Sequence, residues 1–415
     1  MNAIRIQPAT FRLHPSGLVN AAAILYLLHL LLIVKIALLE LTAFWSIFLL
    51  GWAVARGEAW LSWHILYYPL ALYGLISTVS AMLAGRRMHQ GFEAMLWFKM
   101  LIFPAALTLY RQVPRLRKIA PYCFAIVASG GALWGLIQFI FFDQRDLEHR
   151  INGPSPHVMT YSGILMPISL VMLFLWWRER KWWQLVAAVL SALTLLLTFT
   201  RSVWMGWLIA ALAVMLVTRA RALFYALPAL IIFITFLPLP LFGRLISTFD
   251  TRQSSNFDRI RMVEAGVEMI RDFPLLGVGP ANVKEFYSLY RKQDAPRARP
   301  PHLHNNIVQL WAERGILGLA AYILLLALFL RECVRAWNGP KRVWAQVGVA
   351  VTVSLAVAGL FEFNFGDTEV FYMMLNLFAF VVASIEAPEP GQPVPLRQPE
   401  PLPNDPAPQL VPAQI

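Results

Sequence analysis

The residues with the clearest chemical potential form one short polar segment, His302, His304 and Asn305, directly before a long apolar run. An imidazole can accept and release a proton near neutral pH, and an asparagine can orient an imidazole or cap a helix start. Four cations closely precede the segment: Arg291, Lys292, Arg297 and Arg299. Guanidinium groups can hold phosphate oxygens in a bidentate manner. The sequence therefore predicts a proton acceptor beside an anion site, although a basic loop lying on anionic lipid headgroups explains the cations equally well.

A second candidate, Arg201, lies between two apolar runs with almost no loop. An arginine at the centre of a membrane helix costs about 2.5–3.5 kcal/mol on insertion scales, and less toward the interface. A carboxylate, helix-end carbonyls or a bound phosphate must offset this cost. The alternative is an interfacial anchor whose charged end extends to the headgroups.

Two further patterns are weaker. Gly277-Val-Gly279 lacks the Lys-Ser/Thr of a nucleotide loop, so we interpret it as a turn. His302 and His304 have no acidic or cysteine cluster beside them in the sequence to complete a zinc site, so we predict no metal. Cys123 and Cys333 lie in a span and a short loop, and we expect no disulfide.

The composition places these residues in an all-α polytopic membrane protein. Of 415 residues, 58% are hydrophobic and 14% are charged, whereas soluble proteins are nearer half apolar and a quarter charged. A transmembrane helix needs about 20 apolar residues. We predict about twelve such helices, at residues 18–34, 36–55, 61–84, 92–110, 119–142, 158–177, 182–199, 202–218, 222–242, 315–331, 341–361 and 367–385.

The net charge of +12 sets topology and does not indicate nucleic-acid binding. Clusters of Lys and Arg fill four short loops, at 111–118, 178–181, 219–221 and 331–342, which lie on one side together with both termini. The positive-inside rule makes that side cytoplasmic, with Arg86 and Arg87 as an exception.

The opposite face then holds the chemically unusual groups: the segment 143–157, the turn at Arg201, the loop 243–301 and the turn that contains Glu362, Asn364 and Asp367.

Four regions follow from this topology. Residues 1–242 form nine transmembrane helices, 243–314 form a large outer loop with the polar segment, 315–385 form three more helices, and 386–415 form a disordered Pro-rich cytoplasmic tail. No cleavable signal pattern is expected at the start. The outer loop should be partly helical, because four apolar residues recur in it at helical spacing: Ile260, Val263, Val267 and Ile270.

These motifs resemble a known family. His304-Asn305, followed after nine residues by Gly315-x-x-Gly318, resembles the His-[Asn/Ser/Gln]-x9-Gly-x-x-Gly signature of bacterial O-antigen ligases. The stretch from Arg259 to Gly279 resembles the periplasmic loop of the wider O-antigen ligase and polymerase superfamily, which often has an aromatic residue where this chain has Val263. Arg201 resembles the family's arginine at the start of a middle helix. The resemblance covers roughly residues 18–385.

The resemblance implies a glycosyltransferase of the GT-C type in the bacterial inner membrane, with its active site on the periplasmic face. Its donor is a glycan on undecaprenyl pyrophosphate, and a ligase's acceptor is a sugar of the lipid A-core. Such enzymes work without a nucleotide sugar, a metal or another cofactor, and ligases are thought to invert the anomeric centre.

The side-chain chemistry of the candidate residues suggests a role for each in this expected reaction. We predict His304 as the general base on the acceptor hydroxyl, and Arg201, Arg259 and Arg261 as ligands of the pyrophosphate leaving group. Supporting roles fall to three residues: His302 and Asn305 position His304 or the donor, and Asp367 orients an arginine or the imidazole.

Three alternatives stay open. An O-antigen polymerase uses the same donor with a lipid-linked glycan as acceptor, and a protein O-oligosaccharyltransferase is a third variant. A transporter or flippase of lipid-linked glycans belongs to a different class and predicts ionisable or broken spans and an internal repeat. Here no repeat is evident, and only Lys99 and Glu40 look embedded in the membrane.

Overall fold

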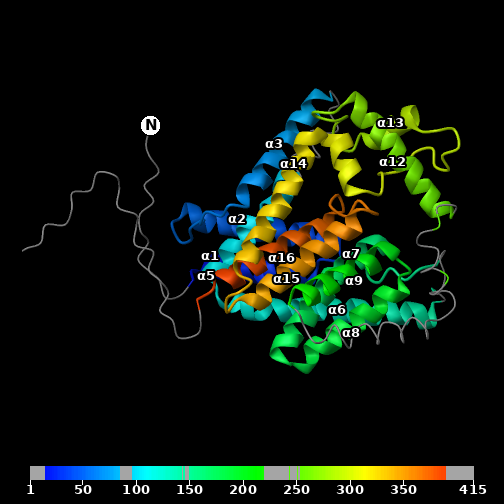
Figure 1. Cartoon of the computed structure of the whole chain (residues 1–415). Coiled ribbons are helices and arrows are strands. Elements are labelled where there is room, and N and C mark those ends of the chain that lie inside the picture. Colours follow the sequence, from blue (N-terminus) through cyan, green and yellow to red (C-terminus); the bar gives the residue numbers. More distant parts are fainter. Residues whose placement is uncertain are drawn as a thin grey trace, which may run out of the picture.

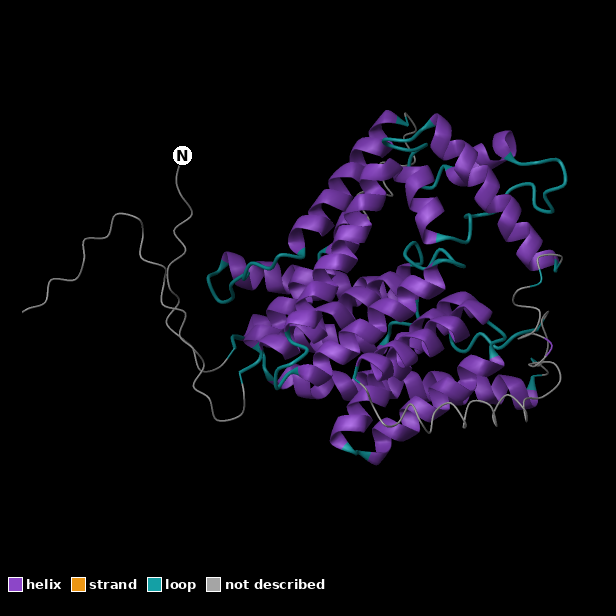
Figure 2. Cartoon of the chain, viewed as in Figure 1, coloured by secondary structure: helices purple, strands orange, loops and turns teal. Residues whose placement is uncertain are grey.

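The computed structural model of the chain describes residues 15–84, 96–142, 144, 149–218, 243, 250 and 253–388. These residues form α-helices joined by turns and loops, without a β-strand among them (Figure 2). The predicted all-α class is therefore confirmed for this part of the chain. The predicted span at 222–242 and the tail beyond Pro388 lie outside the described residues.

The helices, labelled as in Figure 1, are α1 (Gly17–Leu31), α2 (Ile36–Ala55), α3 (Tyr67–Leu83), α5 (Ile102–Gln112), α6 (Arg115–Phe141), α7 (Val158–Glu179), α8 (Trp182–Leu197), α9 (Arg201–Val217), α12 (Ser254–Asp272), α13 (Val283–Tyr290), α14 (Asn306–Arg335), α15 (Arg342–Gly359) and α16 (Thr368–Glu386). Within the described part, six are long and apolar enough to cross a membrane: α2, α6, α7, α14, α15 and α16. Shorter apolar helices are α1, α3, α8 and α9. The chain is a multi-pass membrane protein, and the number of about twelve spans stays a prediction.

One predicted span has a different form. The sequence predicts a single helix at 92–110, whereas the structure has a helical stretch at 96–100, a turn at Leu101 and α5 from Ile102. Pro104 lies in the first turn of α5, where a missing backbone N–H costs no helical hydrogen bond. The helix therefore restarts just before the proline.

The helices form a bundle with a taller part on one side. Figure 1 shows α3 and α14 side by side, rising above the bundle that contains α7, α9, α15 and α16. At the top, α12 packs on α14 and α13 packs on α12. The α12–α13 segment thus extends over the upper ends of the bundle helices.

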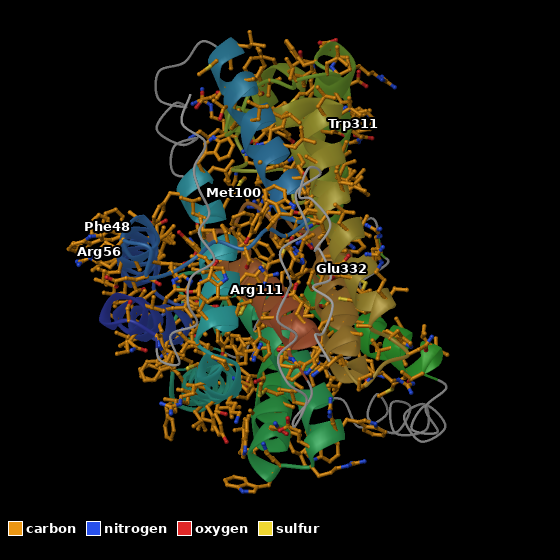
Figure 3. All side chains as sticks on the ribbon, turned by 90° about the vertical axis from the view of Figure 1, so that its left-hand side faces the viewer. Phe48, Arg56, Met100, Arg111, Trp311 and Glu332 are labelled. Atoms are coloured by element: carbon orange, nitrogen blue, oxygen red, sulfur yellow. The ribbon has the colours of Figure 1, made fainter. Side chains whose placement is uncertain are left out.

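Large apolar side chains cover the outside of the bundle. Phe48 and Trp52 of α2 are 49% and 48% exposed, and Figure 3 shows Phe48 pointing away from the rest of the molecule. Exposed apolar surface of this extent is unfavourable in water and is what a helix facing lipid presents.

A separate small core holds the α12–α13 segment in place. Its buried residues are Met262, Ala265, Met269, Val278, Val283, Tyr287, Leu303 and Ala312. The predicted amphipathic helix exists as α12, but only part of its predicted apolar face is buried, because Ile270 packs against the small core whereas Ile260 and Val267 are exposed. The reason is Gly266: a Cβ there would overlap Leu303 and Val308, so the small residues face the core.

The turn that follows α12 docks on a kink in α14. Gly315 has φ 66° and interrupts the helical backbone, a conformation that favours glycine. The carbonyls of Ala312 and Glu313, beside the kink, accept hydrogen bonds from the N–H groups of Val278 (2.8 Å) and Gly279 (2.9 Å). The Gly277–Gly279 sequence is therefore a structural turn, as predicted.

Candidate active site

A cavity of about 720 Å³ lies where α12, the start of α14 and the turn after α15 meet the N-terminal end of α7. Six polar residues in its lining carry the argument that follows: Arg150, Arg259, Arg297, His302, His304 and Glu362. They come from four separate stretches of the sequence. The fold therefore brings the two predicted imidazoles, one predicted arginine and a carboxylate to one cavity.

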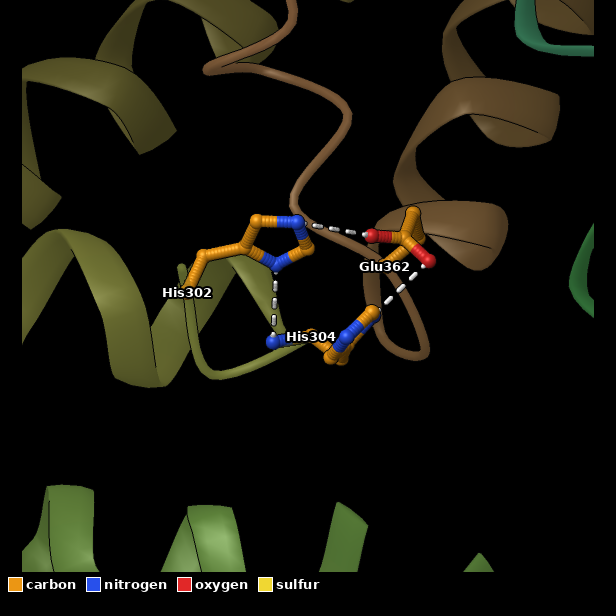
Figure 4. Close-up of side chains that lie close together, drawn as sticks. All are labelled: His302, His304 and Glu362. Atoms are coloured by element: carbon orange, nitrogen blue, oxygen red, sulfur yellow. Dashed lines mark hydrogen bonds and ion pairs between the residues drawn. The ribbon is translucent and has the colours of Figure 1, made fainter. Parts of the chain in front are cut away.

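His304 and Glu362 form a hydrogen-bonded pair in this cavity. Nδ1 of His304 lies 2.9 Å from Oε2 of Glu362, and Nε2 of His302 lies 3.6 Å from Oε1 (Figure 4). An ionised carboxylate only accepts hydrogen bonds, so Nδ1 of His304 is the donor. Nε2 then carries the lone pair, and no hydrogen bond to it occurs among the described residues. His304 is thus arranged to accept a proton at Nε2.

Asn305 connects this segment to the turn that carries Glu362. Its Oδ1 accepts a hydrogen bond from the N–H of Val308 (3.0 Å) and caps α14, so the capping alternative is confirmed. Its Nδ2 donates to the carbonyl of Leu360 (2.8 Å). The Asn305 side chain therefore fixes the start of α14 and also holds the segment of His304 close to the turn that carries Glu362.

Leu303 anchors the segment from the opposite side. It is fully buried in the small core, and its N–H donates to Oε1 of Gln309 (2.7 Å). His304 follows with φ 50°, a left-handed conformation that costs a non-glycine residue about 1–2 kcal/mol. Such strain persists only where the surroundings enforce it, and it is frequent at functional sites.

Glu362 is almost fully enclosed by cationic and hydrogen-bonding groups. Burial alone would raise the pKa of its carboxyl, but the hydrogen bond from His304 and the proximity of His304, His302 and Arg259 lower the pKa below its ordinary value. Nη2 of Arg259 lies 3.8 Å from Oε2. Glu362 therefore stays ionised and can stabilise a positive charge on the imidazole.

His302 has a lower pKa than a surface histidine. Burial lowers its pKa to about 4, although Glu362 opposes this shift. Its Nδ1 accepts a hydrogen bond from the N–H of His304 (3.4 Å), and the two rings lie 4.2 Å apart. His302 is thus a neutral neighbour that supports the strained backbone of His304.

Residues 186–323 match the family model described as O-antigen ligase. This stretch begins in α8, ends within α14 and includes six of the predicted site residues: Arg201, Arg259, Arg261, His302, His304 and Asn305. This match supports membership of the chain in the O-antigen ligase and polymerase superfamily. Among curated proteins, none matches the chain in sequence.

Arg201 lies within the matched stretch but does not line the cavity. Its guanidinium donates to Oε1 of Gln253 (2.6 Å), Oγ of Ser255 (3.1 Å) and Oδ1 of Asn256 (2.6 Å), at the start of α12. The buried arginine thus joins the first turn of α9 to the first turn of α12, which carries Arg259 one turn later.

Arg261 and Asp367 also have partners outside the His304–Glu362 pair. Arg261 pairs with Glu264 (2.7 Å) and with Asp294, and it is not among the residues that line the cavity. Asp367 does line the cavity, but it accepts from the hydroxyl of Thr160 and caps α16 through the N–H of Val370. The imidazole of His304 is held by Glu362 and not by Asp367.

The sequence offered only a coarse signal for Glu362. The carboxylate belongs to a turn that the topology places on the same face as His304, yet it lies 58 residues away and no motif connects the two. Arg150 likewise lies in a segment that the topology places on this face, and no motif marks it out from its neighbours in the sequence. Both are recognised only from their positions in the cavity.

The structure also supplies the acidic group that the sequence lacked beside the two histidines. Ligand atoms of His302, His304 and Glu362 lie within 4.8 Å of one another, so these three side chains could hold a divalent metal ion. The absence of a metal in the active protein stays a prediction.

Proposed function

We propose that this protein is an O-antigen ligase, which transfers a glycan from undecaprenyl pyrophosphate to a sugar hydroxyl of the lipid A-core in lipopolysaccharide biosynthesis. The observation that carries the proposal is the His304–Glu362 pair in a cavity beside Arg259, in a chain that matches the O-antigen ligase family model. The charge pattern supports a cavity on the periplasmic face of the bacterial inner membrane, with both termini in the cytoplasm.

The acceptor hydroxyl needs a base. Nε2 of His304 takes its proton while the hydroxyl oxygen attacks the anomeric carbon of the donor glycan. Glu362 orients the ring and stabilises the imidazolium that forms, as a carboxylate does behind a catalytic histidine. Attack on the face opposite the leaving group inverts the anomeric centre.

The leaving group needs stabilisation rather than a proton. The bond from the anomeric carbon to the pyrophosphate oxygen breaks, and its electron pair stays on the lipid pyrophosphate. Arg259 lines the cavity and offsets this developing charge. Direct contact of Arg201 or Arg261 with the pyrophosphate requires these side chains to leave their present partners, so we give Arg259 the primary role.

Both substrates are lipids and arrive by lateral diffusion in the membrane. The proposed mechanism uses neither a nucleotide sugar nor a metal, because the lipid pyrophosphate already activates the donor glycan as a good leaving group. The two ionisable residues that look embedded in the membrane pair with each other. Nζ of Lys99 lies 3.7 Å from Oε1 of Glu40, and Lys99 also donates to the hydroxyl of Thr368 (2.7 Å). Such a pair satisfies its own charges.

The test is a reconstituted assay with purified protein, undecaprenyl-pyrophosphate glycan and lipid A-core, in which the lipid that carries the product is identified. A ligase places the glycan on lipid A-core, and added chelator leaves the rate unchanged. A longer glycan still on undecaprenyl pyrophosphate would identify a polymerase. No covalent product with any acceptor would favour the transporter, and loss of activity in chelator that a divalent ion restores would refute the metal-free chemistry.

A further inference from the structure

Arg150 is a cation in the cavity wall that has no role in the mechanism proposed above. It lies in the segment between α6 and α7, lines the cavity and is partly buried. Among the described residues, its guanidinium makes no hydrogen bond and no ion pair. A partly buried charge that lacks a partner among the described residues is unfavourable, and a bound anion would offset this cost.

The backbone directly after Arg150 is held against α6. Gln138 of α6 donates to Oδ1 of Asn152 (2.9 Å) and accepts from the N–H of Gly153 (2.8 Å). Gly153 has φ 59°, and a Cβ there would overlap the ring of Tyr161. The backbone immediately after Arg150 is therefore fixed against α6 and α7, which pre-organises the side chain.

Among the described residues, Arg150 shares its nearest carboxylate with other groups. Burial lowers the pKa of Arg150, and the nearby Arg259 lowers it further. Glu362 is the carboxylate that opposes this shift, but it is already engaged by His304, His302 and Arg259.

Arg297, another cation of the cavity wall, has its own carboxylate, because its Nε lies 2.9 Å from Oδ2 of Asp258. Arg150 and Arg259 thus form a pair of neighbouring cations with one shared and largely engaged anion.

We propose that Arg150 is a second phosphate ligand of the donor, so that Arg150 and Arg259 together bind the pyrophosphate through its two phosphate groups. This inference rests on the proposed function for the identity of the anion. A pyrophosphate carries several negative charges and matches two guanidinium groups better than one, since each can make a bidentate contact. Both groups then stabilise the charge that develops on the pyrophosphate as the glycosidic bond breaks.

The first experiment measures binding of inorganic pyrophosphate to the purified full-length protein. Arg150→Ala should weaken binding by about 10-fold or more, the value expected for one lost charged hydrogen-bonding group. Arg150→Lys should give a smaller loss, because an ammonium keeps the charge but not the planar fork. Arg271→Ala is the matched control: among the described residues, this exposed arginine pairs with Glu268 on the same helix, and binding should be unchanged.

The second experiment separates the donor from phosphate groups on the acceptor. In the transfer assay, Arg150→Ala should raise the half-saturating donor concentration by about 10- to 100-fold and leave that of lipid A-core unchanged. A rise confined to lipid A-core would overturn the assignment to the donor. Unchanged pyrophosphate binding in Arg150→Ala, with weaker binding in Arg259→Ala, would overturn the role of Arg150.

Failure of the proposed function looks different. Pyrophosphate binding that depends on Arg150, in a protein that transfers no glycan, would keep the anion site and reject the ligase. If Arg150→Ala does not fold, Arg150→Lys and Gln138→Ala carry the test, because the latter loosens only the segment that positions Arg150.

Discussion

Nδ1 of His304 hydrogen-bonds to Oε2 of Glu362 at 2.9 Å, and this contact fixes which ring nitrogen faces the reaction. His304 directly precedes α14 and Glu362 follows the end of α15, so the two helices between them bring the residues together. Asn305 bridges the same two segments through its bond to Leu360. The fold thus presents the basic Nε2 of a histidine, with a carboxylate behind it, to a cavity that also contains arginines.

Glu362→Gln should lower the rate of glycan transfer by about 10²–10⁴-fold, because an amide can hold the wrong tautomer of His304 and cannot stabilise the imidazolium. The half-saturating substrate concentrations should change little. Steady-state kinetics on the purified variant measure both quantities. Asp367→Asn is the control, since Asp367 contacts Thr160 and not the imidazole, and equal losses in the two variants would argue against a specific pair.

Arg201→Ala should impair use of the donor more than of the acceptor and should also lower the melting temperature. The stability loss follows from three hydrogen bonds to α12 and should be about 1–3 kcal/mol. Asn256→Ala removes one of these acceptors while keeping the cation. If both variants lose stability but neither changes the donor dependence, Arg201 is a structural anchor and not a pyrophosphate ligand.

The dependence of stability on pH should reveal His302. Burial lowers its pKa from 6.5 to about 4, so the folded protein binds this proton less readily than the unfolded chain. The contribution of His302 to stability is therefore fully present above about pH 6.5 and is lost as the pH falls toward 4. Thermal unfolding between pH 4 and 7 measures the effect, and His302→Gln should show a smaller drop. A variant with an unchanged pH profile would place the titrating group elsewhere.

Gly315→Ala should destabilise the protein by about 1–3 kcal/mol, because φ 66° is strained for alanine and the new Cβ would overlap the backbone of Leu275. The docked turn and the small core would be displaced with it. Gly130→Ala is the control, as a Cβ there meets nothing within 4 Å and alanine favours a helix. A melting temperature equal to that of the wild type in Gly315→Ala would show that the kink is not required.

Much of the helical framework follows from the sequence, because apolar runs of membrane length leave the backbone few alternatives. The predicted spans at 158–177 and 182–199 coincide closely with α7 and α8. The amphipathic helix α12 is also found, but its buried face is decided by the close approach of Leu303 to Gly266, which periodicity does not encode.

The site was harder to predict than the helices. His302 and His304 meet at the cavity as expected, since they are two residues apart, and Arg259 joins them. Glu362 and Arg150 reach the same cavity through tertiary packing of distant segments, for which hydropathy gives only the side of the membrane. Arg201 and Arg261 illustrate the converse: the residue types fit an anion site, but local partners engage both side chains.

The most direct test is the transfer of glycan from undecaprenyl pyrophosphate to lipid A-core by purified wild-type protein and by His304→Ala. The wild type should form glycan-bearing lipid A-core, and the variant should be slower by about 10²–10⁴-fold while it still folds and binds inorganic pyrophosphate. Near-normal transfer by His304→Ala would contradict the assignment of His304 as the base.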